Sequence, residues 1–246
     1  MPDLVKEYFA ALRALIDKIQ DTQAEAIDRA ATAIVESAAQ GGAWHIYDTG
    51  HMISSEAIGR AGGLFLARPL RYALTVDNPT RQRPPRGPGG EASLEGLAAY
   101  VLRASNVRRG DVLLIGSVSG KTVPPVDLAI EAKRAGVTVI AMTSLAYSSG
   151  LASEHSSGKR LFEAADIVLD NGAPPEDAML AVPGLGPKIC PASGIGAATI
   201  IWALTAAVVQ KMMARGLTPQ IYKSINKPGN REENEVAEAT YSKVGY

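Results

Sequence analysis

The sequence has no excess of charge of either sign. Its 246 residues include 25 Lys and Arg and 25 Asp and Glu, so the formal net charge is zero. Proteins that bind nucleic acid or an anionic membrane surface through long-range attraction carry a net positive field. The balanced charge therefore argues against a nucleic-acid partner and against a membrane partner.

The chain is also poor in cysteine and lacks a long apolar run. Its single cysteine, Cys190, has no second cysteine for an intrachain disulfide, as is typical of a reducing compartment. The first residues mix charged and apolar side chains, unlike a secretory signal. The longest apolar run, Ile195–Val209, is shorter than the roughly 20 residues that span a bilayer. We therefore expect a cytoplasmic protein in which this run is a buried core helix.

Aromatic residues are scarce at 5%, whereas 46% of the residues are hydrophobic. This balance favours helices packed on a buried sheet over an aromatic-rich β-sandwich. Apolar strands are expected at residues 111–117, 137–144 and 165–171, with a helical pattern between the first two. Further strands are expected at residues 43–50 and 70–76. The alternation of strands and helices predicts one α/β domain over residues 1–246 with a parallel sheet.

The N-terminal residues show a helical pattern in two parts. Apolar side chains recur at helical spacing from Leu4 to Ile19. Thr22 and Glu25 have the spacing of a capping box, which predicts a second helix that ends at Gly41. We expect a helical hairpin over residues 1–40, followed by an α/β core over residues 43–246.

The stretch "GSVSGKT", Gly116–Thr122, ends like a nucleotide-binding phosphate loop, but its first glycine is one position too late for that motif. It lies between an expected strand and the start of an expected helix. Free N–H groups at a helix start, together with the hydroxyls of Ser117, Ser119 and Thr122, favour an anion, and Gly120 allows close approach. The alternative is an ordinary capped strand–helix loop.

Residues Asp111–Ser144 resemble the central segment of sugar isomerase (SIS) domains. The shared pattern is an apolar strand, Ser-x-Ser-Gly-x-Thr, a helix, a turn with glycine and a strand that ends in Thr. The stretches "HMISSEAIGRAGGL", "TSLAYSSGLASEHSSGKRL", "AADIVLDNG" and "SINKPGNREENE" are similar to a phosphoheptose-isomerase-like branch. The resemblance implies a three-layer α/β sandwich with a five-stranded parallel sheet in flavodoxin-like topology. It also implies a phosphorylated sugar as ligand, no cofactor, and a homodimer or homotetramer with sites near subunit interfaces.

By position, the resemblance implies that four residues of the turn hold the sugar phosphate, namely Ser117, Ser119, Gly120 and Thr122. Ser144 follows the next strand and is expected at the same carboxyl edge of the sheet, where ligands bind in open α/β sheets.

The chain departs from the family pattern at two positions. Gly50 stands where family members often have a substrate-binding serine, so Thr49 or a backbone N–H would replace that hydroxyl. Arg60 stands near the glutamate base of phosphoheptose isomerases and related etherases. Glu56 lies one turn earlier and is our candidate base; the alternative is a solvated carboxylate paired with Arg60.

Other polar residues near the expected ligand edge are candidates with open alternatives. His51 and His155 suit acid or base catalysis near neutral pH, or a surface or capping role. Asp48 would bind a sugar hydroxyl or cap a turn. Lys121 would stabilise the phosphate as a point charge or face solvent. His45 lies within an expected strand and is predicted to be a packed core residue.

The predicted function is aldose–ketose isomerisation of a sugar phosphate, which needs a base and an acid or electrophile at the carbonyl. The alternatives are a phosphosugar-binding sensor or regulator without turnover, and a phosphosugar lyase of the etherase type. No cluster of histidine and cysteine has metal-ligand spacing. The "GIGAAT" stretch at Gly194 follows no strand and is therefore not a dinucleotide fingerprint.

Overall fold

The core of the protein is a five-stranded parallel sheet. The structure, a computed structural model, describes residues 3–50, 53–79, 81, 84 and 93–246. The strands are β1 (Trp44–Asp48), β2 (Ala67–Pro69), β3 (Val112–Gly116), β4 (Thr138–Thr143) and β5 (Ile167–Asp170). They are ordered β2-β1-β3-β4-β5, and all neighbours pair in parallel. This order confirms the predicted sheet and its flavodoxin-like topology.

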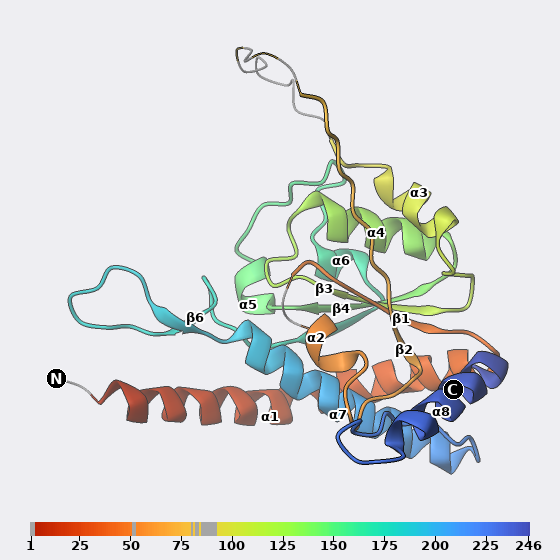
Figure 1. Cartoon of the computed structure of the whole chain (residues 1–246). Helices are drawn as coiled ribbons and strands as arrows, with labels where there is room; N and C mark the ends of the chain where they lie inside the picture. The colour runs from red at the N-terminus through yellow and green to blue at the C-terminus, as the bar shows by residue number, and fades with distance from the viewer. Residues whose placement is uncertain (1–2, 51–52, 80, 82–83, 85–92) are drawn as a thin grey trace.

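Helices cover both faces of the sheet (Figure 1). α1 (Leu4–Ala39) and α7 (Ser193–Ala214) pack on one face, and α3 (Leu97–Ala104) and α4 (Val123–Arg134) on the other. Successive strand residues alternate between the two faces, so Leu114 lies in the α1–α7 core and Leu113 in the α3–α4 core. The remaining helices are α2 (Ser54–Ala57), α5 (Leu145–Ser148), α6 (Leu161–Ala164) and α8 (Asn230–Val244).

The predicted N-terminal hairpin is wrong, because α1 is one continuous helix of 36 residues. Its Thr22 hydroxyl does not cap a new helix but donates to the carbonyl of Lys18, 2.7 Å away, within the same helix. The helix has no glycine or proline between Leu4 and Ala39 that would break it. Its second half is buried under the sheet, and its first half extends beyond the body of the protein (Figure 1).

The second strand lies earlier than predicted. β2 ends at Pro69, and the Leu70 amide makes a last bond to the Ile46 carbonyl at 2.8 Å. Leu74 and Val76 are 64% and 80% exposed, so the apolar pattern of residues 70–76 has no sheet to join. The helix after β1, α2, is short, because Ile58 is extended and Gly59 has a φ of +70°.

A two-stranded antiparallel hairpin, which the sequence did not predict, consists of β6 (Ala178–Leu180) and β7 (Ile189–Pro191). It projects from the start of α7 beside the first half of α1 (Figure 1). The apolar run Ile195–Val209 lies in α7 and is a core helix as predicted, with Ile200, Leu204 and Val208 fully buried. By length and composition alone, α7 is also apolar enough to cross a membrane.

Candidate functional site

The carboxyl ends of the strands bring the predicted site residues to one edge of the sheet. Asp48 at the end of β1 pairs with Gly116 at the end of β3, and Gly116 pairs with Met142 near the end of β4. The strand order turns back between β1 and β3, and ligands in such sheets bind in the crevice at this reversal. The turn from β3 to α4, residues 117–122, follows directly and forms one wall of this edge.

Backbone hydrogen bonds fix the shape of the 117–122 turn. The Ser117 amide donates to the Met142 carbonyl at 3.0 Å, and the Gly120 carbonyl accepts from the Leu161 amide at 2.7 Å. The Val118 carbonyl accepts from the Ser144 amide at 3.1 Å and from the Thr143 hydroxyl at 2.9 Å. The turn is therefore held from β4 and α6 before any ligand arrives.

Gly120 is the residue of this turn at which a side chain would be most strained. Its φ is +56°, and an added Cβ would lie 3.1 Å from both the Leu161 Cβ and the Thr143 Oγ1. The hydroxyl of Ser148 would be 3.2 Å away, and this buried hydroxyl has no hydrogen-bond partner among the described residues. Sequence reasoning missed Ser148, although it lies in a stretch that resembles the family.

The turn presents several polar groups without an internal partner. Within the described part of the chain, the amides of residues 119–122 donate to no recorded acceptor. Thr122 is the N-cap residue of α4 but makes no side-chain capping bond. Ser119 and Thr122 are half-buried, whereas Ser117 is only 4% exposed. Free amides and hydroxyls at a helix start are suited to an anion, and the role of these residues in phosphate binding stays a prediction.

Ser144 differs from the serines of the turn, because its hydroxyl is already occupied. It donates to the Ala173 carbonyl at 2.7 Å and accepts from the Tyr147 amide at 3.1 Å. The residue is fully buried as the N-cap of α5. Its position at the ligand edge matches the expectation and its hydroxyl bonds within the fold, so a phosphate contact from Ser144 stays a prediction.

The turn after β1 is also braced from within. The Asp48 Oδ2 accepts from the Ile53 amide at 2.8 Å and the Ser54 amide at 3.3 Å, so its carboxylate caps the start of α2. The Thr49 hydroxyl donates to the Gly116 carbonyl at 3.2 Å, which ties this turn to the end of β3. Gly50 has open space where a Cβ would be. Of the two alternatives for Asp48, the cap is thus the one with observed bonds.

Lys121 does not stand free beside the turn. Its Nζ lies 2.5 Å from the Glu154 Oε1, and this bond raises the pKa of the lysine. The Glu154 amide also donates to the Lys121 carbonyl at 2.9 Å. A phosphate at the turn would therefore compete with Glu154 for the ammonium group.

The candidate base Glu56 is paired as well. Its Oε1 lies 2.6 Å from the Arg60 Nη1, and the two side chains are 34% and 52% exposed. This ion pair is the alternative to a catalytic role that the sequence left open. The recorded bond uses one of the two Glu56 oxygens, and the catalytic role of Glu56 stays a prediction.

The histidines fall into three different settings. His51 lies outside the described residues. The Nδ1 of His155 accepts from the Ser157 amide at 3.0 Å, and its Nε2 lies 3.5 Å from a buried Asp127 oxygen. That distance suits an ion pair but is too long for a hydrogen bond, and the His155 Nε2 has no hydrogen-bond partner among the described residues. His155 thus faces Asp127 of α4, and its role in catalysis stays a prediction.

His45 is a buried core residue, as predicted. It is 7% exposed, and its Nε2 lies 3.0 Å from the Asp111 Oδ2. In the part of the chain that the structure describes, no group of three histidine, cysteine or carboxylate side chains is placed to hold a metal ion.

The chain is similar to known proteins over most of its length. A family model for the SIS domain matches residues 7–144. A UPF0309 protein of Shouchella clausii is 34% identical over 233 residues, which is 94% of each chain. A UPF0309 protein of Streptomyces griseus is 34% identical over 94% of this chain and 92% of its own length.

Two solved structures share the fold at low sequence identity. The phosphoheptose isomerase of Neisseria gonorrhoeae superposes with a TM-score of 0.55 at 16% identity, over 85% of this chain and 98% of its own. That of Francisella tularensis has a TM-score of 0.53 at 18% identity, over 85% and 100% of the two chains. At these identities the likeness shows the fold alone.

Proposed function

This chain belongs to the SIS domain family, and we propose that it binds a phosphorylated sugar at the β3–α4 turn and interconverts its aldose and ketose forms. The observation that carries the proposal is the turn itself. It is held rigidly by β4 and α6, and it leaves the amides of residues 119–122 and the Ser119 and Thr122 hydroxyls without partners among the described residues. A phosphate monoester supplies acceptors for such donors.

The sugar would extend from the phosphate toward the β1 turn. Thr49 and Gly50 border that crevice, and the absence of a side chain at Gly50 leaves room for a hydroxyl-rich chain. Glu56 follows on α2, so it is the described carboxylate best placed to move a proton between adjacent carbons. Arg60 would then pass from Glu56 to the developing negative charge on the substrate oxygen.

Binding and turnover are tested separately. Ser117 and Ser119 are replaced together by alanine, and Ser242→Ala, an exposed serine on α8, serves as control. Calorimetry with a panel of aldose and ketose phosphates should show binding for the native protein and the control, and a loss of about tenfold or more for the double variant. Unchanged affinity in the double variant would refute the phosphate site.

Turnover is measured by NMR in heavy water with the same panel. Interconversion, or exchange of the proton next to the carbonyl, supports an isomerase, and Glu56→Gln should abolish it. Binding without either signal supports the second candidate, a phosphosugar-binding sensor. The ion pair of Glu56 with Arg60 favours that second candidate, because it occupies the carboxylate that catalysis requires.

We also propose that the protein is a cytoplasmic homodimer or homotetramer. The exposed first half of α1 carries Val5 and Phe9, which are 68% and 50% exposed. An apolar cavity of about 370 Å³ lies beside it, between Ile16 and Ile27 of α1 and Ala203 of α7. A second copy would cover these apolar groups, and sedimentation that reports a monomer at micromolar concentration would contradict the assembly.

A further inference from the structure

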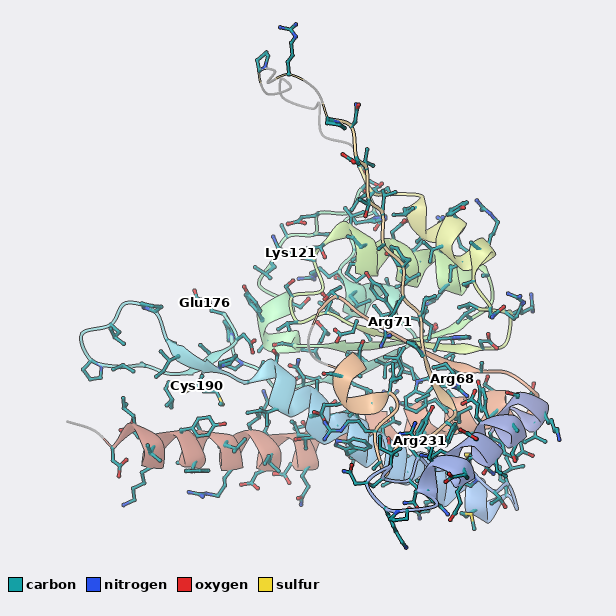
Figure 2. The ribbon with its side chains drawn as sticks, in the orientation of Figure 1. Arg68, Arg71, Lys121, Glu176, Cys190 and Arg231 are labelled. Carbon is teal, nitrogen blue, oxygen red and sulfur yellow. The ribbon has the colours of Figure 1, made fainter. Side chains whose placement is uncertain are left out.

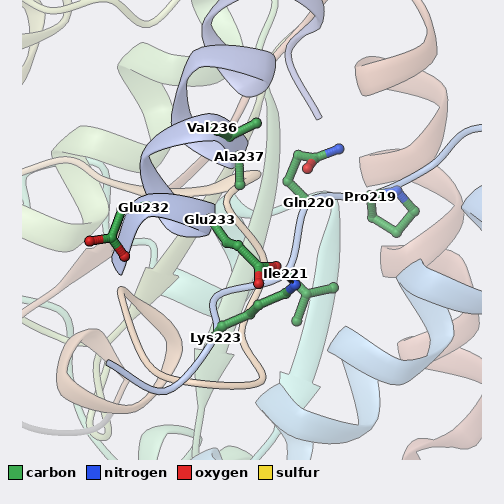
Figure 3. A pocket seen from close by; sticks show the side chains of 8 residues that line it. All are labelled: Pro219, Gln220, Ile221, Lys223, Glu232, Glu233, Val236 and Ala237. Atoms are coloured by element: carbon green, nitrogen blue, oxygen red, sulfur yellow. Dashed lines mark hydrogen bonds and ion pairs between the residues drawn. The ribbon is translucent and has the colours of Figure 1, made fainter. Parts of the chain in front are cut away.

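A polar cavity lies near the amino ends of β1 and β3, at the edge of the sheet opposite the β3–α4 turn. Its volume is about 490 Å³, within the range of sites for small molecules. His45 and Arg68 line it and are paired neighbours on β1 and β2, so their side chains leave the same face of the sheet. In Figure 2, Arg68 and Arg71 lie apart from Lys121, near β1 and β2. A separate cavity of about 500 Å³ lies under α8 and includes Lys223 and Glu233, which pair with each other (Figure 3).

His45, which lines this amino-edge cavity, is paired with the buried carboxylate of Asp111, which lines an adjoining cavity. Asp111 accepts hydrogen bonds from the His45 Nε2 at 3.0 Å, the Ala43 amide at 2.9 Å and the Arg108 amide at 2.7 Å. Burial raises the pKa of the Asp111 carboxyl, but the bond from His45 and those from the two amides outweigh it and hold the pKa below its ordinary value. The carboxylate is therefore ionised and accepts from the His45 Nε2.

The other ring nitrogen of His45 is left for a ligand. Among the described residues, none makes a recorded hydrogen bond with the His45 Nδ1. His45 lines the cavity, so this nitrogen is the ring atom that a bound molecule can meet.

Two arginines on the wall have different roles. The Nη2 of Arg68 donates to both carboxylate oxygens of Glu238 at 2.9 and 3.0 Å, and its guanidinium lies 3.8 Å from the centroid of the Tyr241 ring. Arg68 is therefore fixed as part of the wall. Arg71, by contrast, is exposed and has no ion-pair partner in the described part of the chain.

Further arginines lie close to this cavity, and the two carboxylates beside it, Glu238 and Asp111, are already bonded within the protein. An adjoining cavity of about 270 Å³ shares Ala43 and Asn106 with this one and is lined by Arg108 and Arg109. Asp111 is the one carboxylate among the described residues that line the two cavities, and its oxygens already accept three bonds from the protein. Arg71 has no recorded ion pair with another described residue, and the Nδ1 of His45 has no recorded hydrogen bond with one. Such an arginine and histidine in one cavity favour an oxyanion as ligand.

We propose that the cavity of His45, Arg68 and Arg71 binds a small molecule through an oxyanion, a phosphate or carboxylate group. Arg71 supplies the main ion pair, and His45 donates from Nδ1. The site lies at the opposite end of β1 from the sugar-phosphate turn, so the protein has two independent anion sites.

The test follows the NMR chemical shifts of the three histidine rings. The protein is titrated with inorganic phosphate and, separately, with malonate, at fixed pH and ionic strength. The background is the Ser117→Ala, Ser119→Ala protein, in which the other proposed site is disabled. The His45 signal should shift to saturation while that of His155 stays still. A response to phosphate alone, to malonate alone or to both supports the site and identifies its oxyanion class.

Arg71→Ala should weaken the binding by roughly tenfold, which corresponds to about 1.4 kcal/mol. Arg103→Ala removes the same charge from an exposed position on α3 outside the cavity and should leave the affinity unchanged. A His45 signal that neither anion moves would overturn the proposal. Equal weakening by the two arginine variants would also overturn it. That result would mean that the anion responds to the overall charge of the protein and not to a specific contact with Arg71.

Discussion

Gly120 offers the sharpest test of the turn that carries the proposed function. The substitution Gly120→Ala adds one methyl group at a residue with a φ of +56°. The left-handed backbone costs a residue with a Cβ about 1–2 kcal/mol. The new Cβ would also lie 3.1 Å from the Leu161 Cβ and from the Thr143 Oγ1, closer than packed atoms normally approach. Forcing extra volume into such a site costs about 1–3 kcal/mol.

The two terms together lower the free energy of unfolding by about 2–5 kcal/mol. Gly41→Ala is the matched control, since Gly41 has a φ of +81° but nothing within 4 Å of the added Cβ. It should lose only the backbone term, about 1–2 kcal/mol. Urea unfolding followed by circular dichroism measures both variants.

The two glycine variants should also differ in their affinity for a sugar phosphate. Gly41→Ala lies after α1 and should bind a sugar phosphate like the native protein, whereas Gly120→Ala shifts the donors of the turn and should bind it at least tenfold more weakly. If the two variants lose the same stability and both keep full affinity, the turn is neither tightly packed nor the phosphate site.

Three ionic or capping contacts lead to further tests. Asp177→Ala removes the carboxylate that accepts from two amides and a hydroxyl at the start of α7, and should cost about 1–2 kcal/mol in urea unfolding; no loss would show that the cap is dispensable. The bond from Arg160 lowers the pKa of Glu163 to about 2, so the contribution of this pair to stability is present above the ordinary pKa of the carboxyl and is lost as the pH falls toward 2. An NMR titration should find that low pKa and, in Arg160→Ala, a return toward the ordinary value; an ordinary value in the native protein counts against the pairing. Glu154→Gln removes the partner that raises the pKa of Lys121 and should tighten sugar-phosphate binding several-fold in calorimetry, because the ammonium group is released to the ligand; weaker binding would indicate that Glu154 positions the lysine instead.

The sheet could be predicted from the sequence where its strands are buried on both faces. β3 and β4 are continuous apolar runs bounded by glycine or polar residues, and every residue of β3 is buried. β2 lies at the edge and has three residues, so its position depends on the neighbour that it meets and not on its own pattern. Leu74 and Val76 have the alternating pattern of a strand, but no neighbouring strand among the described residues pairs with them. The sequence pattern alone does not show whether such a neighbour exists.

The hairpin prediction for α1 failed for a similar reason. Thr22 and Glu25 have the spacing of a capping box, but a threonine hydroxyl can equally bond back to the carbonyl four residues earlier. The contact of α1 with α7 and β5 favours one long helix, and neither contact is visible in the local sequence. Tertiary packing therefore decided between two local patterns that the residues permitted equally.

The candidate site was predictable only where its residues are adjacent in the chain. The serines, glycine and threonine of the β3–α4 turn come from one short motif and necessarily lie together. The partners of Lys121 and His155 are 33 and 28 residues away from them, at Glu154 and Asp127, and only the fold brings those pairs together. The sequence could therefore propose Lys121 for phosphate binding and His155 for catalysis, but it could not reveal which carboxylate lies beside each of them.

The prolines after the turn determine which groups can hold an anion there. Pro124 and Pro125 occupy the second and third positions of α4 and have no N–H, so this helix start offers fewer amides than usual. The helix dipole remains, but direct hydrogen bonds must come from residues 119–122 and from the hydroxyls of the turn. For this reason the serine substitutions should be more damaging than at an ordinary helix start, where the backbone alone could retain a phosphate.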